Sequence, residues 1–402
     1  MLPFVTAAAC GAAALSYARS GNPSVREEER GGGEGGSSTM MYNWSQRSTA
    51  WSPTSLDVKH EIGAVCWSET DPFKLLVGSA EDDPFNQLSI VERVEGRLVT
   101  TAVAEHRYQP AKLMFLPGQN DRYFASASDT VYLWDQSKQT VGESGRNKLQ
   151  TPYETDCETF ADFERTLEPL ALPPQWATGK YTAPIVGFDI VDTVLVAAHC
   201  DGQCMVWDLN IAEAAGRKDP PLLNHAADST SRALYDVVCA PVTSDMLGRF
   251  AACGIGGVFL YDARTRGPVM QLPAAARFGV CHKLAWNAGC DRQIAVAFND
   301  DVAVLDLRLE HTPLGLFAHK GRVRDLGWAS HDRSWLCTCG DDGNAFMWAT
   351  DGDGEEDEQE ASPVFAFERP GRLLRRLAWG THPDCQDWVA VSVDNTLEVV
   401  HV

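Results

Sequence analysis

Apolar and polar residues alternate in short runs along most of the chain, and the runs recur with a common ending. Each recurrence closes on a large apolar residue that is often followed by Asp. Seven such endings fall at Ile90, Trp134, Trp207, Tyr261, Leu305, Trp348 and Val400. Alternation with a period of two is typical of half-buried strands, and a unit of roughly 40–45 residues that recurs predicts a repeat architecture.

One unit carries an almost complete pattern. Residues 319–348 read HKGRVRDLGWASHDRSWLCTCGDDGNAFMW, with alternating segments at 323–328, 334–339 and 344–348 and a turn signal at 341–343. The segment 363–368, PVFAFE, supplies a fourth strand. A four-stranded unit that ends in Trp, or Trp-Asp, is the signature of a WD-repeat blade. The sequence therefore predicts an all-β fold, a seven-bladed WD-repeat β-propeller.

The first strand of each blade can be placed in the same way. We expect these strands at 63–67, 112–116, 184–188, 234–239, 281–286, 322–328 and 373–379. The chain ends on the third strand of the seventh blade, so the segment near 51–58 is expected to supply the missing outer strand and to close the ring. Residues 1–40, which include GGGEGGSS, are expected to form a disordered low-complexity tail, and residues 41–402 the propeller.

A polar network is expected inside the sixth blade. WD repeats join a loop His, a strand Ser or Thr, a turn Asp and the strand Trp, and the matching residues are His319, Thr338, Asp342 and Trp348. The same residue types could suggest a catalytic set, but a buried Trp N–H needs a partner, which favours the structural interpretation. The other blades are expected to lack a full network. His106 and His225 lie near the loop positions of their blades, and Tyr261 and Leu305 replace the Trp.

Composition narrows the class of function. The chain has 402 residues and a net charge of −21, which argues against general binding to nucleic acid or to anionic membranes. Twelve Cys are present, but neither Cys337 with Cys339 nor Cys200 with Cys204 has a second pair at zinc-site spacing. We expect buried thiols in a reducing compartment, with no metal, no cofactor and no small-molecule substrate. The acidic insertions at 136–165 and 351–360 are expected to be solvated loops, with a partner tether as the alternative.

Several stretches resemble one WD-repeat family. They are GAVCWS (63–68), FKLLVGSAEDD (73–83), HRYQPAKLMFLPG (106–118), FASASDTVYLWD (124–135), YTAPIVGFD (181–189), KLAWN (283–287), VAVLDLRLEHTPLGLFAHKGRV (302–323) and NTLEVVHV (395–402). The family is that of the plant TRANSPARENT TESTA GLABRA protein and its animal relative, a WD-repeat scaffold among the DDB-cullin-4 associated factors. The sequence departs from it in the tail, in both acidic insertions and in blade 4.

The resemblance implies a scaffold without catalysis, in cytoplasm and nucleus, that assembles transcription regulators or kinases of the DYRK type. It also implies an alternative, a substrate-receptor or adaptor subunit of a cullin-4 ubiquitin ligase. That link depends on an Asp-x-Arg ending of the third strand, which Asp262 with Arg264 and Asp306 with Arg308 match. The other possibility is that each Arg pairs with acidic neighbours inside its blade. A propeller enzyme would need convergent ligands or carboxylates in the channel, and no such repeated set is present in the sequence.

One further pattern predicts a docking face. At the start of the first strands, blades 1–3 carry small residues, whereas blades 4–7 carry Tyr235, His282, Arg324 and Arg375, followed in two blades by Lys283 and Arg376. We call these six residues the basic arc. Because Arg offers bidentate donors to carboxylates and phosphates, the basic arc suggests an acidic or phosphorylated partner. The alternative is that these side chains pack on Trp faces and pair locally.

Overall fold

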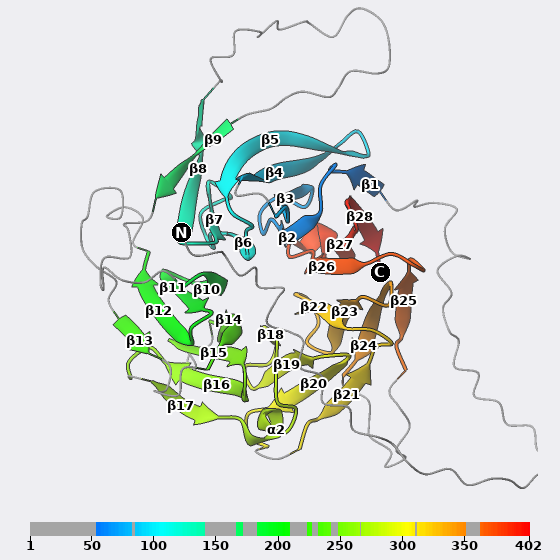
Figure 1. Ribbon diagram of the computed structural model, residues 1–402. Coiled ribbons are helices and arrows are strands. Elements are labelled where there is room, and N and C mark those ends of the chain that lie inside the picture. Colours follow the sequence, from blue (N-terminus) through cyan, green and yellow to red (C-terminus); the bar gives the residue numbers. More distant parts are fainter. Residues whose placement is uncertain are drawn as a thin grey trace, which may run out of the picture. The chain divides into compact units, whose positions relative to one another are not determined.

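The computed structural model describes residues 54–82, 85–140, 166–171, 183–209, 223–226, 232–242, 248–265, 267–309, 312–350 and 362–402. In this part of the chain, strands predominate, and the helical elements are α2 (Pro273–Ala276) and the 3-10 turn Pro383–Cys385. The strands form seven four-stranded antiparallel blades arranged around a centre (Figure 1). The prediction of a seven-bladed WD-repeat β-propeller is confirmed.

The first three blades follow one another along the chain, innermost strand first. Blade 1 consists of β2 (Ile62–Trp67), β3 (Lys74–Ser79), β4 (Phe85–Val94) and β5 (Arg97–Arg107). Blade 2 consists of β6 (Lys112–Phe115), β7 (Tyr123–Ala127), β8 (Val131–Thr140) and β9 (Thr166–Ala171). Blade 3 consists of β10 (Ile185–Val191), β11 (Val194–His199), β12 (Gln203–Asp208) and β13 (Leu223–Ala226).

Blades 4 to 6 have the same order. Blade 4 consists of β14 (Leu234–Cys239), β15 (Arg249–Gly254), β16 (Gly257–Asp262) and β17 (Pro268–Gln271). Blade 5 consists of β18 (Lys283–Trp286), β19 (Gln293–Phe298), β20 (Asp301–Asp306) and β21 (Gly315–Ala318). Blade 6 consists of β22 (Val323–Trp328), β23 (Trp335–Gly340), β24 (Asn344–Ala349) and β25 (Phe365–Glu368). The innermost strands begin within two residues of their expected positions, and β10 ends three residues beyond its expected end.

The seventh blade joins the two ends of the propeller. Its strands β26 (Leu374–Trp379), β27 (Trp388–Val393) and β28 (Thr396–His401) come from the end of the chain, and β1 (Thr54–Asp57) adds the outer strand. The pairing is antiparallel and runs from Thr54 opposite Val399 to Asp57 opposite Thr396. The closing strand expected near 51–58 is therefore confirmed.

Blades 1 and 2 are joined at one point. A single parallel pair, Val103 opposite Thr166, links β5 to β9 and merges the two blades into one eight-stranded sheet. Strand β8 also continues to Thr140, so the insertion expected at 136–165 begins inside a strand rather than after it. The rest of that insertion up to Thr166, the acidic run at 351–360 and the tail boundary at residue 40 lie outside the described residues.

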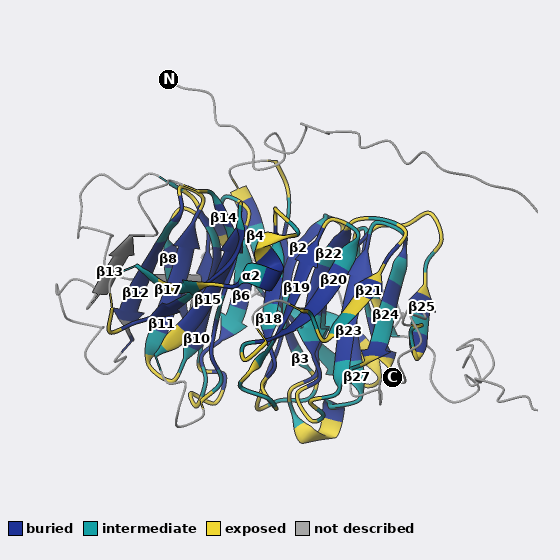
Figure 2. Cartoon of the chain, turned by 90° about the horizontal axis from the view of Figure 1, so that it is seen from below, coloured by how far each residue is buried: buried dark blue, intermediate teal, exposed yellow. Residues whose placement is uncertain are grey.

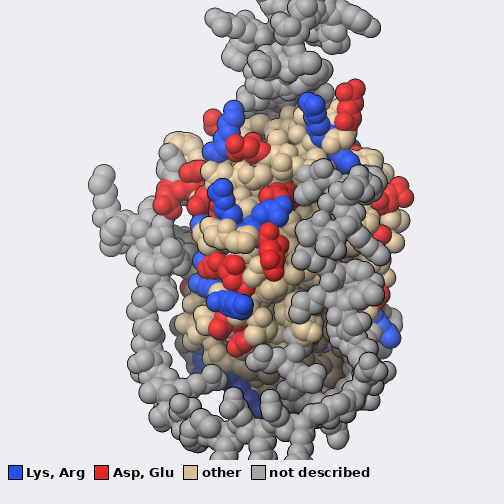
Figure 3. All heavy atoms as spheres, turned by 90° about the vertical axis from the view of Figure 1, so that its right-hand side faces the viewer, with Lys and Arg blue, Asp and Glu red and all other residues tan. Residues whose placement is uncertain are grey.

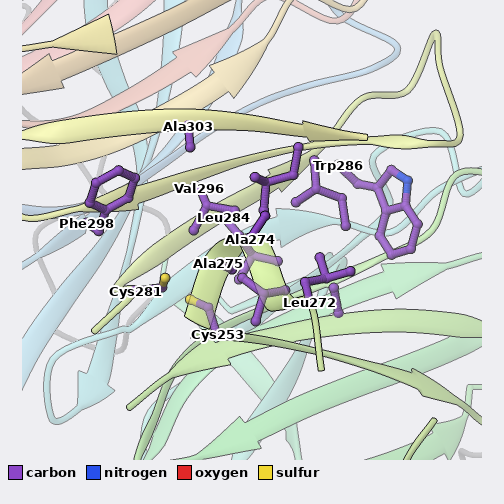
Figure 4. Packing of buried hydrophobic residues seen from close by; sticks show 14 of the residues in the cluster. Cys253, Leu272, Ala274, Ala275, Cys281, Leu284, Trp286, Val296, Phe298 and Ala303 are labelled. Carbon is purple, nitrogen blue, oxygen red and sulfur yellow. The ribbon is translucent and has the colours of Figure 1, made fainter. Parts of the chain in front are cut away.

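The apolar core is divided among the joints between blades. Seven clusters of buried residues are present, and each draws its members from two adjacent blades. In the cluster between blades 4 and 5, Cys253 and Cys281 lie beside Leu284, Val296 and Ala303 (Figure 4). Exposed residues gather in the loops at the two edges of the ring, while the strands between them are mostly buried (Figure 2). A blade therefore buries its faces only when both neighbours are present.

No helix among the described residues combines the length and the apolar character needed to cross a bilayer.

Removal of the closing strand should destabilise the ring. We expect deletion of residues 1–40 to leave the melting temperature nearly unchanged, because β1 is retained. Deletion of residues 1–60 removes β1 and opens the edge of β28, so the melting temperature should fall by several degrees or more. Differential scanning calorimetry of the two truncated proteins checks this, and equal shifts would contradict the closure.

Candidate partner-binding surfaces

The sixth blade contains the polar network that the sequence predicts. The hydroxyl of Thr338 accepts a hydrogen bond from Trp348 Nε1 at 2.8 Å and contacts His319 Nε2 at 2.7 Å. His319 Nδ1 lies 3.1 Å from a carboxylate oxygen of Asp342. Burial alone would raise the pKa of the Asp342 carboxyl, but hydrogen bonds from His319 and from two backbone N–H groups hold it below its ordinary value. The Thr338 hydroxyl makes both of these contacts inside the blade, which fits a structural role.

Blade 2 keeps more of this network than the sequence suggests. His106 Nε2 lies 2.9 Å from the hydroxyl of Ser126, which accepts a hydrogen bond from Trp134 Nε1 at 2.8 Å. His106 Nδ1 contacts the Tyr108 carbonyl instead of a turn carboxylate. The expectation that only blade 6 is nearly complete therefore needs correction. The signal was present in the sequence, because Ser126 precedes Trp134 much as Thr338 precedes Trp348.

Disruption of the blade 6 network should lower stability without a specific loss of function. Trp348→Phe and His319→Ala each leave a buried polar group without its partner, at a cost of about 1–3 kcal/mol in the free energy of unfolding. Urea denaturation measures this cost. A loss of partner binding by His319→Ala at an unchanged free energy of unfolding would contradict the structural role.

Charged side chains from the innermost strands line the central channel, around a cavity of about 300 Å³. The six are Lys112, Asp189, Asp236, Lys283, Asp325 and Arg376. Lys112 Nζ lies 3.2 Å from Asp189, and this ion pair joins blades 2 and 3. Lys283 Nζ lies 3.2 Å from Asp236 and 3.6 Å from Asp325, and these two contacts join blades 4, 5 and 6. These contacts form a chain of ion pairs between blades.

The channel carboxylates also accept backbone hydrogen bonds from the following blade. Asp189 accepts from the N–H of Cys239 at 2.7 Å, and Asp325 accepts from the N–H of Leu377 at 3.2 Å. Arg376 closes the series through its hydrogen bond to the Gly63 carbonyl across the joint between blades 7 and 1. Burial favours neutral Lys112, but Asp189 and Asp236 raise the pKa of its ammonium. The channel charges therefore hold the ring together and largely neutralise one another.

The residues of the basic arc are also paired locally. Arg324 makes two hydrogen bonds of 2.7 Å to Asp341, and Arg375 lies 3.1 Å from Glu61. Burial lowers the pKa of His282 to about 4, and its Nε2 donates to the Val323 carbonyl at 2.7 Å. Tyr235 is half-buried. On the side of the ring seen in Figure 3, Lys and Arg are interspersed with Asp and Glu.

These pairs agree with the alternative considered for the arc, local pairing. Five of the seven innermost strands have a register shift near their start, and in blades 4, 6 and 7 it falls at Tyr235, Arg324 and Arg375 to Arg376. A bulge re-aims the side chains next to it. The basic arc is therefore not an uncompensated positive surface, and a role of its six residues in partner binding stays a prediction.

The buried imidazole of His282 should make stability depend on pH. Its pKa is lowered from 6.5 to about 4, so between these values the unfolded chain binds a proton that the folded chain does not. Stability should fall as the pH drops through this window, by up to about 1.4 kcal/mol per pH unit from this group. His282→Gln keeps a hydrogen-bond donor for the Val323 carbonyl. In urea denaturation, we expect the free energy of unfolding of this variant to fall less steeply between pH 7 and pH 4 than that of the wild type. An unchanged slope would contradict the prediction.

The two Asp-x-Arg endings have the same geometry. Arg264 donates to both oxygens of Asp262 at 2.9 and 2.6 Å, and Arg308 donates to both oxygens of Asp306 at 3.0 and 2.5 Å. The Arg264 hydrogen bonds lower the pKa of the Asp262 carboxyl to about 2. Both arginine side chains stay open to solvent, with exposed fractions of 73% and 63%. Each Arg is thus paired within its blade and still presented at the edge of the ring, on adjacent blades 4 and 5.

The cysteines show no metal site in the part of the chain that the structure describes. Ten free thiols are present, and no group of three or more His, Cys, Asp or Glu side chains is arranged to hold a metal ion there. Burial raises the pKa of the Cys337 thiol to about 12, so this thiol stays protonated. These features suit small apolar packing groups.

Comparison with curated proteins supports the WD-repeat class of protein. Over 356 residues the chain is 23% identical to a DDB1- and CUL4-associated factor 7 homolog from Dictyostelium discoideum, with 85% of this chain and 96% of that protein aligned. The relatives are WD-repeat proteins. No protein-family profile matches the chain.

Two other relatives match over a smaller share of their length. Histone-binding protein MSI1 from Saccharomyces cerevisiae is 26% identical over 289 residues, 70% of this chain and 64% of that protein. Denticleless protein homolog B from Xenopus laevis is 20% identical over 317 residues, 65% of this chain and 44% of that protein. Together with the fold, these relatives support a protein-interaction scaffold or adaptor. The narrower resemblance to the plant TRANSPARENT TESTA GLABRA proteins stays a prediction.

Proposed function

We propose that the protein is a non-catalytic scaffold that holds several protein partners on the two loop edges of its propeller. The observation that carries this proposal is that the charged side chains of the channel are paired within the ring. The ionisable side chains that the innermost strands place in the channel pair with one another and with backbone groups of neighbouring blades, as Lys283 does with Asp236 and Asp325. An enzyme would need acids, bases or ligands in that channel that are available to a substrate. The surfaces left for function are the loops.

The partners that the resemblance implies are transcription regulators and kinases of the DYRK type, in cytoplasm and nucleus. The relatives support protein partners in general. These finer assignments remain part of the proposal. A WD-repeat ring suits such a role, because rigid blades present separate loop surfaces at fixed positions.

A specific observation favours a second function, an adaptor or substrate receptor of a cullin-4 ubiquitin ligase. Arg264 and Arg308 lie at equivalent positions on adjacent blades, and each is both oriented by its Asp and exposed. Arg held in a fixed orientation loses less conformational entropy on binding, so it is well suited to a contact residue. The likeness to a DDB1- and CUL4-associated factor 7 homolog is consistent with this function.

One affinity-purification experiment distinguishes the two functions. We expect the tagged full chain to retain a small set of proteins from native cells, identified by mass spectrometry. If the protein is also a cullin-4 adaptor, the DDB1-type adaptor should be among them, and the double variant Arg264→Ala, Arg308→Ala should reduce its recovery about tenfold while other partners remain.

A matched control is the double variant Arg107→Ala, Arg372→Ala. These two arginines are 65% and 64% exposed and also pair with acidic side chains, Asp129 and Asp394, but they lie at loops of the opposite edge. Recovery of other partners without the cullin adaptor would support the scaffold function and contradict the adaptor function. If the folded protein retains no partner, the scaffold itself is contradicted.

A further inference from the structure

Two aliphatic side chains stand exposed next to each other on blade 4. Ile255, in the turn between β15 and β16, forms an isolated bridge with Val280, in the connection from blade 4 to blade 5. Their exposed fractions are 45% and 47%. Both segments lie at the edge of the ring where the innermost strands begin. Two apolar side chains on paired backbone positions, both open to water, form an anchor point for an apolar group.

The surface under this pair is rigid. The N–H of Gly256 donates to the Gly279 carbonyl at 2.8 Å, and Gln271 donates to the Gly256 carbonyl at 2.6 Å. Phe278 stacks on Phe298 with 3.8 Å between ring centroids. Helix α2 precedes this segment and buries Ala274 and Ala275 in the core between blades 4 and 5 (Figure 4). A surface fixed in this way loses little entropy when a partner binds.

Three cations on neighbouring connections lack an ion pair among the described residues. Arg277, Lys320 and Arg322 are exposed and make no ion pair with any residue that the structure describes. The nearby carboxylate of Asp341 is already taken by two hydrogen bonds from Arg324. Burial and the neighbouring Arg324 guanidinium lower the pKa of Arg322, and the Asp341 carboxylate offsets this only in part. A carboxylate from outside would relieve this repulsion.

The cations and the apolar pair belong to one surface. His282, two residues after Val280, donates to the carbonyl of Val323, the residue that follows Arg322. An extended chain advances about 3.3 Å per residue, so a short segment can reach from Val280 to Arg322.

We propose that Ile255, Val280, Arg277, Lys320 and Arg322 form a docking site for an acidic segment of a protein partner. Its carboxylates pair with Arg322 and the neighbouring cations, and an adjacent aliphatic or aromatic side chain covers Ile255 and Val280. This inference rests on the proposed scaffold function and names the chemistry of one partner. Nucleic acid fits less well, because it requires a longer basic surface and this chain carries a net charge of −21.

A phage-displayed library of random linear peptides, panned on the full-length protein, tests the proposal. We expect the enriched peptides to place Asp or Glu within a few residues of Leu, Ile, Phe or Trp. In fluorescence anisotropy with labelled copies of these peptides, Arg322→Glu and Val280→Asp should each weaken binding about tenfold or more. Binding should also weaken as salt is added, because salt screens the charge attraction.

A matched control uses the β4–β5 hairpin of blade 1. Val94 is 49% exposed and pairs across the turn with Arg97, so Val94→Asp and Arg97→Glu make the same chemical changes on another surface. These variants should bind the peptides like the wild type. Circular dichroism and melting temperatures should agree among all four variants, since the substituted side chains are exposed.

Three outcomes would overturn the docking site. They are enrichment of peptides without acidic residues, equal binding by Arg322→Glu and the wild type, and failure to enrich any peptide on the folded protein. Tighter binding of phosphorylated copies than of Glu copies, by about tenfold, would replace the carboxylate partner with a phosphorylated one. If the variants lose peptide binding yet keep the partners found by affinity purification, the scaffold function is supported, and this docking site is not the main binding site for those partners. Loss of all partners by the wild type itself would instead contradict the scaffold.

Discussion

Each blade of this protein buries its two faces only against its neighbours, and the rest of the structure depends on this constraint. The seven apolar clusters all lie at joints between blades. A blade at an open end would expose one of its faces, so the ring has to close. Strand β1 closes it by pairing with β28, which joins the start of the described chain to its end. The closing strand is short, but it completes the last blade.

Polar groups follow the same arrangement. Asp189 and Asp325 each accept a backbone hydrogen bond from the next blade, and Lys283 lies between carboxylates of blades 4 and 6. A buried charge is costly unless it is paired, so these contacts are needed once the channel is lined with ionisable residues. As a consequence, the channel charges serve the ring, and the loop edges remain for partners.

The two edges differ in chemistry, which suits a protein that binds more than one partner. Strand β16 connects them, because Ile255 lies in the turn before it and Arg264 in the loop after it. One edge of blade 4 presents aliphatic side chains beside cations, and the other presents an arginine held by Asp262. Partners bound at both edges would lie on opposite sides of one rigid blade, at a separation fixed by the length of the strand.

The sequence by itself determined the blades, the positions of the innermost strands, the closing segment and the hydrogen-bond set around Thr338. These features depend on a local period of two, on turn residues and on a Trp that needs a partner, and all three can be read along the chain. Only the tertiary structure decided that Arg324 pairs with Asp341, that Arg375 pairs with Glu61 and that Arg322 forms no ion pair of its own among the described residues. Asp341 lies in the turn between β23 and β24, and Glu61 lies just before β2 of the first blade, far from Arg375 in the sequence. Alternation along one strand tells which face a residue takes, but it carries no information about which charge from a distant strand will lie across from it.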